Sequence, residues 1–290
     1  MLKKRRSALF VPGNNPGMFK DVIAYHPDIV IFDLEDAISP KEKDAARELT
    51  KRMLNFFNYQ EYNIETAVRI NHFDTEFYYQ DLKAIVNSNV DIIRLPKVET
   101  KTEVLKCIAD IEMIEKSINR TKPVLLFCAI ESAKGVLNAY EIASADKRVV
   151  AIALGGFDYV LDLNATKSND RKELLFGRNM VLHAARAAKI DAFDSVFGDI
   201  NDLAGLKKET EFIKELGFTG KSAIHPNQVP IINQIFTPNE KEIAHALAII
   251  TAYQKHQKIN KGVFTVNGKM VDKPIIEKAE KLLLLAEIKI

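Results

Sequence analysis

The sequence contains no tryptophan, only two cysteines and almost no excess of charge of either sign. Its 41 lysines and arginines face 39 aspartates and glutamates, which gives a formal net charge of +2. Proteins that bind nucleic acids or membrane surfaces carry a clustered basic excess. The one basic run, Lys3–Arg6, is short and is interpreted as a solvated tail. The charge distribution therefore gives no support to binding of DNA, RNA or membrane surfaces.

Long apolar runs are also missing. No segment approaches the ~18 apolar residues that a membrane-spanning helix needs. The apolar segment Ala8–Val11 stops at Pro12-Gly13, which is too short for the core of a signal peptide. Cys107 and Cys128 fall in a predicted helix and a predicted buried strand, so we expect buried thiols rather than a disulfide. A cytoplasmic protein is the expectation.

The sequence also lacks the motifs of two kinds of binding site, one for dinucleotides and one for zinc. No G-x-G-x-x-G motif follows any of the early strands, which argues against a dinucleotide-binding doubly wound sheet. The histidines do not show the spacing of zinc ligands; they include His26, His72, His183, His245 and His256.

What the sequence does contain is a regular alternation of short apolar segments and helical patterns. The segments predicted as strands are Ser7–Val11, Asp28–Leu34, Thr66–Ile70, Asp91–Leu95, Val124–Ile130, Val149–Leu154, Ile190–Val196 and Lys221–Ile224. Helices are predicted between them, for example over Ala133–Ala145 and Arg171–Ala188, and Ser39-Pro40 with Glu42 predicts a capping box at a helix start. Eight such units predict an α/β fold of the (β/α)8 TIM-barrel type over residues 1–237, with the site in the loops that follow the strands.

The alternation stops after this region. Residues 238–290 predict a helix over Asn239–Lys258, two strands on either side of Asn267-Gly268, and a helix over Pro274–Glu287. Asn-Gly between two short strands is a strong hairpin signal; the strands are predicted at Val263–Val266 and Lys269–Val271. We expect this helix–hairpin–helix segment to form an appendage that can fold over the site or reach a neighbouring subunit.

Charged residues gather at the ends of the predicted strands. They are Glu35, Asp36, Arg69, Arg94, Lys97, Glu131 and Asp158, with Asn71 and His225 beside them. The carboxyl ends of barrel strands meet at one mouth. Acidic groups at some strand ends and basic groups at others suggest a site for a hard cation and an anionic substrate. A lone histidine such as His225 is more often structural.

Glu131 and Asp158 each follow a strongly apolar strand, and these two strands are consecutive. Two ionised carboxylates buried without a positive partner would cost several kcal/mol each. Mg2+ commonly takes only one or two protein carboxylates and completes its shell with water and substrate. The alternative is that Glu131 pairs with Arg69 or Lys134 and that Asp158 caps the next loop. The residue pattern leaves both open.

Several longer motifs carry a resemblance to a known family. In order along the chain they are SALFVPGNNPGM, IFDLEDAISPKEKDAAR, VRIN, IIRLPK, AIES, ALGGFDY, KSAIHPNQ and NGKMVDKP. Together they resemble the beta chains of citrate lyase (citryl-CoA lyase), within the wider group of CitE-like and HpcH/HpaI aldolases. The resemblance extends from about Ser7 into the last predicted helix.

The resemblance implies a barrel with a C-terminal lid, homo-oligomers (a trimer or larger) in which lids close neighbouring sites, and Mg2+-dependent cleavage of a 3-hydroxy-acyl thioester. By it, Glu131 and Asp158 hold Mg2+ and Arg69 faces the substrate. Asp272 in the lid becomes a candidate acid or base, where the hairpin alone would suggest a turn residue. Glu35, Asp36, Arg94 and Lys97 belong to the same mouth.

The implied reaction converts a citryl thioester, on CoA or on an acyl carrier protein, into oxaloacetate and an acetyl thioester, with other citrate lyase subunits as possible partners. Many relatives carry an acidic residue directly before the metal-binding aspartate, and this chain has Phe157 there. That departure leaves citramalyl-CoA and malyl-CoA open as substrates. An alternative of another class is a non-catalytic scaffold subunit that binds the thioester.

Overall fold

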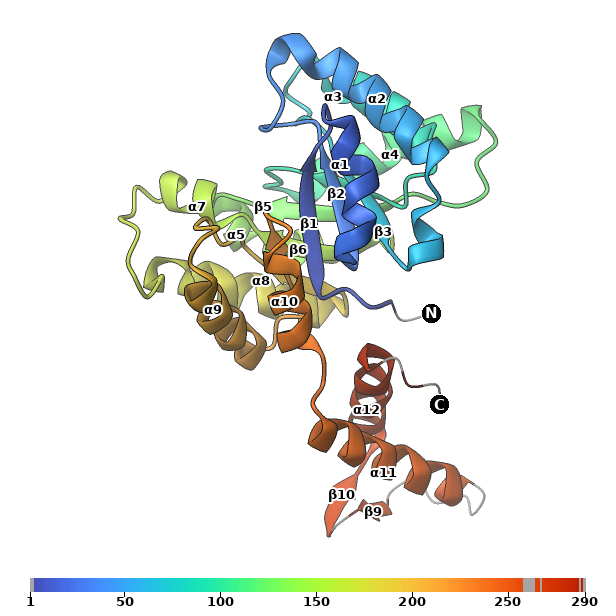
Figure 1. Cartoon of the computed structure of the whole chain (residues 1–290), viewed down its shortest axis with the longest axis vertical. Coiled ribbons are helices and arrows are strands. Elements are labelled where there is room, and N and C mark those ends of the chain that lie inside the picture. Colours follow the sequence, from blue (N-terminus) through green and yellow to red (C-terminus); the bar gives the residue numbers. More distant parts are fainter. Residues whose placement is uncertain (1–2, 258–263, 267, 287, 289–290) are drawn as a thin grey trace. The chain divides into compact units, whose positions relative to one another are not determined.

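Eight parallel strands close into a barrel in the order of the sequence, with β1 paired to both β2 and β8 (Figure 1). The strands are β1 (Ser7–Pro12), β2 (Ile29–Asp33), β3 (Glu65–Arg69), β4 (Ile92–Leu95), β5 (Leu125–Ile130), β6 (Val149–Leu154), β7 (Asp191–Asp194) and β8 (Gly220–Ala223). This computed structural model describes residues 3–257, 264–266, 268–286 and 288. The predicted (β/α)8 barrel is confirmed.

Large and small apolar side chains share the barrel interior. Phe127 on β5 and Phe193 on β7 meet there with their ring centroids 4.9 Å apart. The strands between and opposite them contribute shorter residues; the interior cluster also holds Ala8, Ile29, Ile31, Ala67, Ile92, Ala151 and Ala153. Because side chains alternate in and out along a strand, this interior set fixes which residues reach the mouth.

The amino-terminal end of the barrel is closed by buried ion pairs. The Arg5 guanidinium donates to both carboxylate oxygens of Glu65, at 2.7 and 3.0 Å, and lies 3.2 Å from Asp191. Arg6 pairs with Asp28 at 2.8 Å. The interpretation of this basic run as a solvated tail is therefore wrong for Arg5 and Arg6, which are buried because acidic residues at the strand starts need partners.

Helices follow the strands around the outside of the barrel (Figure 1). They are α1 (Pro16–Asp21), α2 (Lys43–Phe56), α3 (Tyr78–Val86), α4 (Lys101–Ser117), α5 (Ala133–Leu137), α6 (Ala139–Ala143), α7 (Gly156–Asp162), α8 (Leu175–Ala188), α9 (Leu203–Leu216) and α10 (Gln228–Phe236). Short 3-10 turns adjoin some of them: η1 (Val22–Tyr25), η2 (Pro40–Glu42), η3 (Tyr59–Tyr62) and η4 (Lys172–Leu174).

Three helix predictions differ from the structure. The single helix expected over Ala133–Ala145 is two short helices that meet at Asn138. The capping box at Ser39 is wrong, since the Ser39 hydroxyl donates to the Glu42 carboxylate and makes no cap hydrogen bond to the backbone. Helix α7 was not predicted, and it carries Asp158 in its first turn.

The chain divides into two compact units, of which Arg5–Asn233 is the barrel. A second unit begins at Gln234 and contains α11 (Glu240–Gln257), the antiparallel strands β9 (Phe264–Val266) and β10 (Lys269–Val271), and α12 (Lys273–Leu285). Its own core is formed by Ala246, Ile249, Ile250, Val266, Val271, Ile276, Ala279 and Leu283. Asn267 and Val263 of the predicted hairpin lie outside the described residues.

Both cysteines are free and buried, as expected from the sequence. Burial raises the pKa of the Cys107 thiol to about 12, so this thiol is protonated at neutral pH. Among the residues that the structure describes, no helix has the length and apolar character to cross a membrane.

Candidate active site at the carboxyl ends of the strands

Arg69, the last residue of β3, is held by a carboxylate on the neighbouring strand. Its Nε and Nη2 donate to the two oxygens of Asp33, at 2.7 and 2.6 Å. Asp33 and Arg69 stand side by side in the strand register, which makes this two-pronged contact possible. Burial would lower the pKa of Arg69, but the hydrogen bonds and charges of Asp33 and the acidic loop outweigh it and raise that pKa.

The loop after β2 brings two more carboxylates to Arg69. Arg69 Nη1 lies 2.9 Å from Glu35 Oε2 and 3.1 Å from Asp36 Oδ2. Asp33 also accepts from the backbone N–H groups of Glu35 and Ala37, at 2.9 and 3.1 Å, and so fixes the loop as well as the arginine. From behind, the Lys43 ammonium donates to the carbonyls of Leu34 and Glu35, both at 2.9 Å.

Lys97, just after β4, joins this acidic loop to the next strand end. Its ammonium donates to Glu35 Oε1 at 2.7 Å, and its backbone N–H lies 3.4 Å from Glu131 Oε1. The backbone of Lys97 has φ +50°, a left-handed conformation that costs a non-glycine residue free energy and that gathers at functional sites. Desolvation lowers the pKa of Lys97, but its contact with Glu35 prevails and raises it.

Arg94 on β4 is a buried cation among aromatic rings. Its guanidinium carbon lies 4.2 Å from the centroid of Phe127 and 5.4 Å from that of Phe10. Its Nε and Nη1 are buried and have no hydrogen-bond partner among the described residues. Burial lowers the pKa of Arg94 to about 10, with Glu131 the main opposing charge.

Glu131 follows β5 and is 7% exposed. Its Oε2 is buried and has no hydrogen-bond partner among the described residues. Burial, together with the charge of Glu35 and contact with Asp158, raises the pKa of Glu131 to about 7. The alternative partners considered from the sequence are engaged elsewhere: Arg69 with Asp33, and Lys134 with Glu99 at 2.9 Å.

Two adjacent glycines allow Asp158 to approach Glu131. A Cβ on Gly155 would lie 2.5 Å from Cγ of Glu131, and one on Gly156 would lie 2.8 Å from Oγ of Ser195. Both distances are shorter than real Cβ contacts, so with any larger residue either the neighbouring side chain or α7 must move. The Gly-Gly pair therefore serves close packing of the Asp158 turn against the end of β5.

These carboxylates fit Mg2+. The described residues form no cluster of three or more His, Cys, Asp or Glu side chains that could hold a metal ion by themselves. Mg2+ needs only one or two protein carboxylates, since water and substrate oxygens complete its octahedron. The buried, unpartnered oxygen of Glu131 next to Asp158 provides that kind of donor set.

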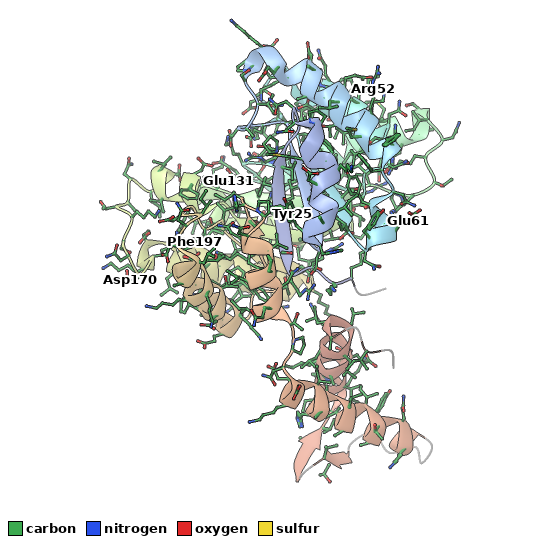
Figure 2. All side chains as sticks on the ribbon, in the orientation of Figure 1. Tyr25, Arg52, Glu61, Glu131, Asp170 and Phe197 are labelled. Carbon is green, nitrogen blue, oxygen red and sulfur yellow. The ribbon has the colours of Figure 1, made fainter. Side chains whose placement is uncertain are left out.

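The structure thus brings together the predicted residues of the barrel mouth, and Figure 2 labels Glu131 among them. His225 is not part of this contact network; its Nδ1 accepts from the backbone N–H of Asn227 at 3.2 Å. Asp272 lies in the second unit, where it caps α12 by accepting from the N–H of Ile275. Sequence reasoning missed Asp33 and Lys43, although both lie within the IFDLEDAISPKEKDAAR motif.

Comparisons with known proteins agree with this architecture. The model of the HpcH/HpaI aldolase/citrate lyase family matches residues 6–226, and a model for C–C bond lyases of the TIM-barrel fold matches residues 174–289. The citrate lyase subunit beta of Leuconostoc mesenteroides subsp. cremoris is 45% identical, over 97% of this chain and 93% of its own length.

A mitochondrial citramalyl-CoA lyase from Rattus norvegicus is 30% identical, over 97% of this chain and 86% of its own. A crystal structure of CitE from Mycobacterium tuberculosis, in complex with magnesium, acetoacetate and coenzyme A, matches 98% of both chains with a TM-score of 0.75 and 29% identity. These matches show that the protein is a carbon–carbon lyase. The chain belongs to the HpcH/HpaI aldolase/citrate lyase family.

Proposed function

We propose that the protein is a Mg2+-dependent lyase that cleaves a citryl thioester into oxaloacetate and an acetyl thioester. The observation that carries this proposal is the buried Glu131 carboxylate beside Asp158, which interacts electrostatically with the cations of Arg69, Arg94 and Lys97. The similarity to citrate lyase beta subunits at 45% identity supports citryl as the acyl group. The thioester is carried by CoA or by an acyl carrier protein.

The carboxylates of the mouth serve the first part of the reaction, in which the hydroxyl is activated and the carbon–carbon bond breaks. Glu131 and Asp158 would hold Mg2+, which would supply a Lewis acid that lowers the pKa of the citryl hydroxyl. Asp272, in its ionised form, takes the proton of the citryl hydroxyl, so that the hydroxyl oxygen becomes the keto oxygen of oxaloacetate as the carbon–carbon bond breaks. The electron pair of that bond passes into the enolate of the acetyl thioester.

The cations of the mouth stabilise the charges that this reaction develops. Arg69 is oriented by Asp33 and stabilises the enolate oxygen, as an oxyanion hole does. Arg94 and Lys97 attract the substrate carboxylates, and Glu35 and Asp36 keep Arg69 and Lys97 in place. A proton must finally reach the acetyl carbon, and we assign its delivery to Asp272.

This assignment gives each part of the chain a role. Residues 1–237 form the catalytic barrel, and residues 238–290 are a lid and oligomerisation extension. Asp272 acts on the site of a neighbouring subunit in a homotrimer or larger homo-oligomer. The protein works in the cytoplasm, alone or with other citrate lyase subunits.

Incubation with citryl-CoA and Mg2+ tests the proposal directly. Oxaloacetate is measured through its reduction by malate dehydrogenase and NADH, with Glu131→Gln as the matched inactive variant. We expect release of oxaloacetate that EDTA abolishes and that Glu131→Gln lacks. Failure to release it, under conditions where another thioester is cleaved, refutes the citryl assignment.

The second candidate is cleavage of citramalyl-CoA or malyl-CoA. It is favoured by the relative named citramalyl-CoA lyase and by Phe157, which takes the place of an acidic residue next to Asp158. The same assay with these thioesters distinguishes the substrates by kcat/KM. A non-catalytic scaffold would cleave none of them, and its response to Mg2+ would be the same in wild type and Glu131→Ala.

A further inference from the structure

We propose that the loop after β7, residues 195–198, is a support that positions Asp158, and that Ser195 and Lys221 are positioning residues for the metal site. The inference rests on the proposed function, because it takes Asp158 to be a Mg2+ ligand. It gives a role to the KSAIHPNQ motif, whose residues have no part in the chemistry proposed above.

Lys221 is the first residue of that motif and is fully buried behind the barrel wall. Its ammonium has three protein acceptors: Asp194 Oδ2 at 2.7 Å, Glu209 Oε1 at 2.7 Å and the carbonyl oxygen of Ser195 at 2.6 Å. Arg178 completes the ion cluster by donating to both oxygens of Asp194. An ammonium has three donors, so every one is used, and one of them fixes the backbone directly after β7.

Ser195 connects this cluster to the helix that carries Asp158. Its Oγ accepts from the backbone N–H of Gly156 at 3.0 Å. The first N–H groups of any helix lack partners inside the helix, and α7 has no capping side chain of its own because its N-cap is Gly155. Ser195 therefore supplies from the loop after β7 the hydrogen bond that a local cap would supply.

A second contact holds α7 on the same loop. A Cβ on Gly198 would lie only 2.7 Å from Cζ of Phe157, so the ring of Phe157 rests against the glycine backbone. Phe157 lies between Gly156 and Asp158 in the first turn of α7. The turn is thus fixed on both sides of the metal ligand, by Ser195 and by Gly198.

The loop itself is held at its far end by the last residue of the motif. Gln228 is fully buried, and its side-chain amide donates to the carbonyl of Phe197 at 2.9 Å. Its Oε1 accepts from the N–H groups of Ile224 and His225. Lys221 and Gln228 therefore secure both ends of the loop, while Ser195 and Gly198 carry α7.

The matched test compares two hydroxyl deletions on the β7–β8 pair. Ser195→Ala removes the support at the mouth. Thr219→Val removes a hydroxyl that accepts from Ala192 N–H, at 3.0 Å, at the amino-terminal end of β7. Binding of Mn2+ to each full-length protein is measured by EPR of the free ion, without any assay of catalysis.

We expect Ser195→Ala to weaken Mn2+ binding by about tenfold, as loss of a group that orients a ligand does. Thr219→Val should bind Mn2+ like wild type even if its Tm falls. Equal Mn2+ affinity of Ser195→Ala and wild type would overturn the inference alone. Absence of Mn2+ binding by wild type would overturn the metal site of the proposed function, and the inference with it.

A second pair of variants covers the case in which Ser195→Ala does not fold. Gly198→Ala should displace Phe157 and weaken Mn2+ binding, and the double variant Gly198→Ala/Phe157→Leu should recover it, since leucine lacks the outer ring atom. General destabilisation would not be reversed by the second substitution. If the double variant did not recover Mn2+ affinity, the proposed role of the loop in positioning α7 would be contradicted.

Discussion

The pKa values of single residues at the mouth depend on two opposing effects, burial and contact with specific partners. Glu131 and Arg94 are both buried, and burial shifts their pKa values toward each other, up to about 7 for Glu131 and down to about 10 for Arg94. Desolvation disfavours the charged form of either group. Arg69 is partly buried, but the close contact with Asp33 raises its pKa. The charged partners of each group, more than the extent of its burial, therefore decide whether its charged form is favoured.

The raised pKa of Glu131 predicts how the stability of the metal-free protein depends on pH. The folded protein keeps a proton on Glu131 up to about pH 7, whereas the unfolded chain releases it near the ordinary value of 4.5. Between these values the folded state binds more protons, so the free energy of unfolding falls as pH rises through this window. Urea denaturation with EDTA at several pH values measures this slope.

Glu131→Gln is the control for that slope, because an amide does not titrate. The variant should lose less stability than wild type between pH 4.5 and 7, and Mg2+ should stabilise wild type most at the upper end, where its ligand is ionised. Parallel pH profiles of the two proteins would show that Glu131 does not titrate in this range.

The two-pronged contact of Asp33 predicts a strong effect of a residue outside the reacting groups. In Asp33→Asn the amide cannot accept from both Nε and Nη2 of Arg69, so Arg69 loses its fixed orientation. Loss of one charged hydrogen bond of about 1.5–3 kcal/mol lowers kcat/KM by about 10- to 100-fold. Steady-state kinetics with the cleaved thioester measure it.

Asp36→Asn is the matched control, because Asp36 is 57% exposed and accepts from Arg69 through a single contact, at 3.1 Å, where Asp33 accepts through two. Its kcat/KM should change far less, since solvent screens exposed pairs. Similar losses in the two variants would mean that charge near Arg69, and not its orientation by Asp33, is what matters.

Among the elements, the turn between β6 and α7 needs glycine because it packs closely against Glu131. Gly155→Ala places a Cβ 2.5 Å from Cγ of Glu131, so Glu131 or α7 must move. We expect loss of most Mg2+-dependent activity with little change in far-UV circular dichroism. Gly17→Ala is the control, since its Cβ would have a single neighbour at 3.5 Å. Activity near wild type in Gly155→Ala would show that the packing at this turn can adapt.

The strands could be predicted within about two residues because buried parallel strands are continuous apolar runs bounded by turn residues. Helix α7 could not, since the segment after Leu154 begins with two glycines and has no local cap. Its N-terminal hydrogen bond comes from Ser195, which is 39 residues away in sequence. Local sequence signals do not contain such a partner.

The ring of charged residues at the mouth was predicted for the same reason as the strands, because strand ends fix which residues meet. The pairings between residues on neighbouring strands could not be predicted, because they depend on the strand register. Arg69 lies beside Asp33 in the register of β2 and β3, which explains their pairing. Arg94 lies beside Phe127 in the register of β4 and β5, which explains why its guanidinium faces that ring. Burial of Arg5 and Arg6 likewise needs the acidic residues at the strand starts.

For the whole molecule, the proposed function requires that two compact units act together. Asp272 has a structural role within its own unit, as the N-cap of α12. Its proposed role as an acid can be separated from this one, because asparagine caps a helix about as well as aspartate, whereas alanine costs about 1 kcal/mol. Asp272→Asn should therefore keep the Tm of wild type and lose most lyase activity. Full activity of the Asp272→Asn protein would show that Asp272 acts only as a helix cap.

If Asp272 serves the site of a neighbouring subunit, two inactive variants should restore activity when they are combined. Asp272→Asn keeps Glu131, and Glu131→Gln keeps Asp272. In a co-expressed equal mixture, about one quarter of the sites would pair an intact barrel of one chain with an intact lid of another, if subunits assemble at random around a closed symmetric ring. We expect about that fraction of wild-type kcat, while each variant alone stays inactive. Assembly of mixed oligomers is checked by purification through different tags on the two chains. Tagged mixed oligomers without activity would place Asp272 and Glu131 of each working site in the same chain, because only then does every site in the mixture contain a defect.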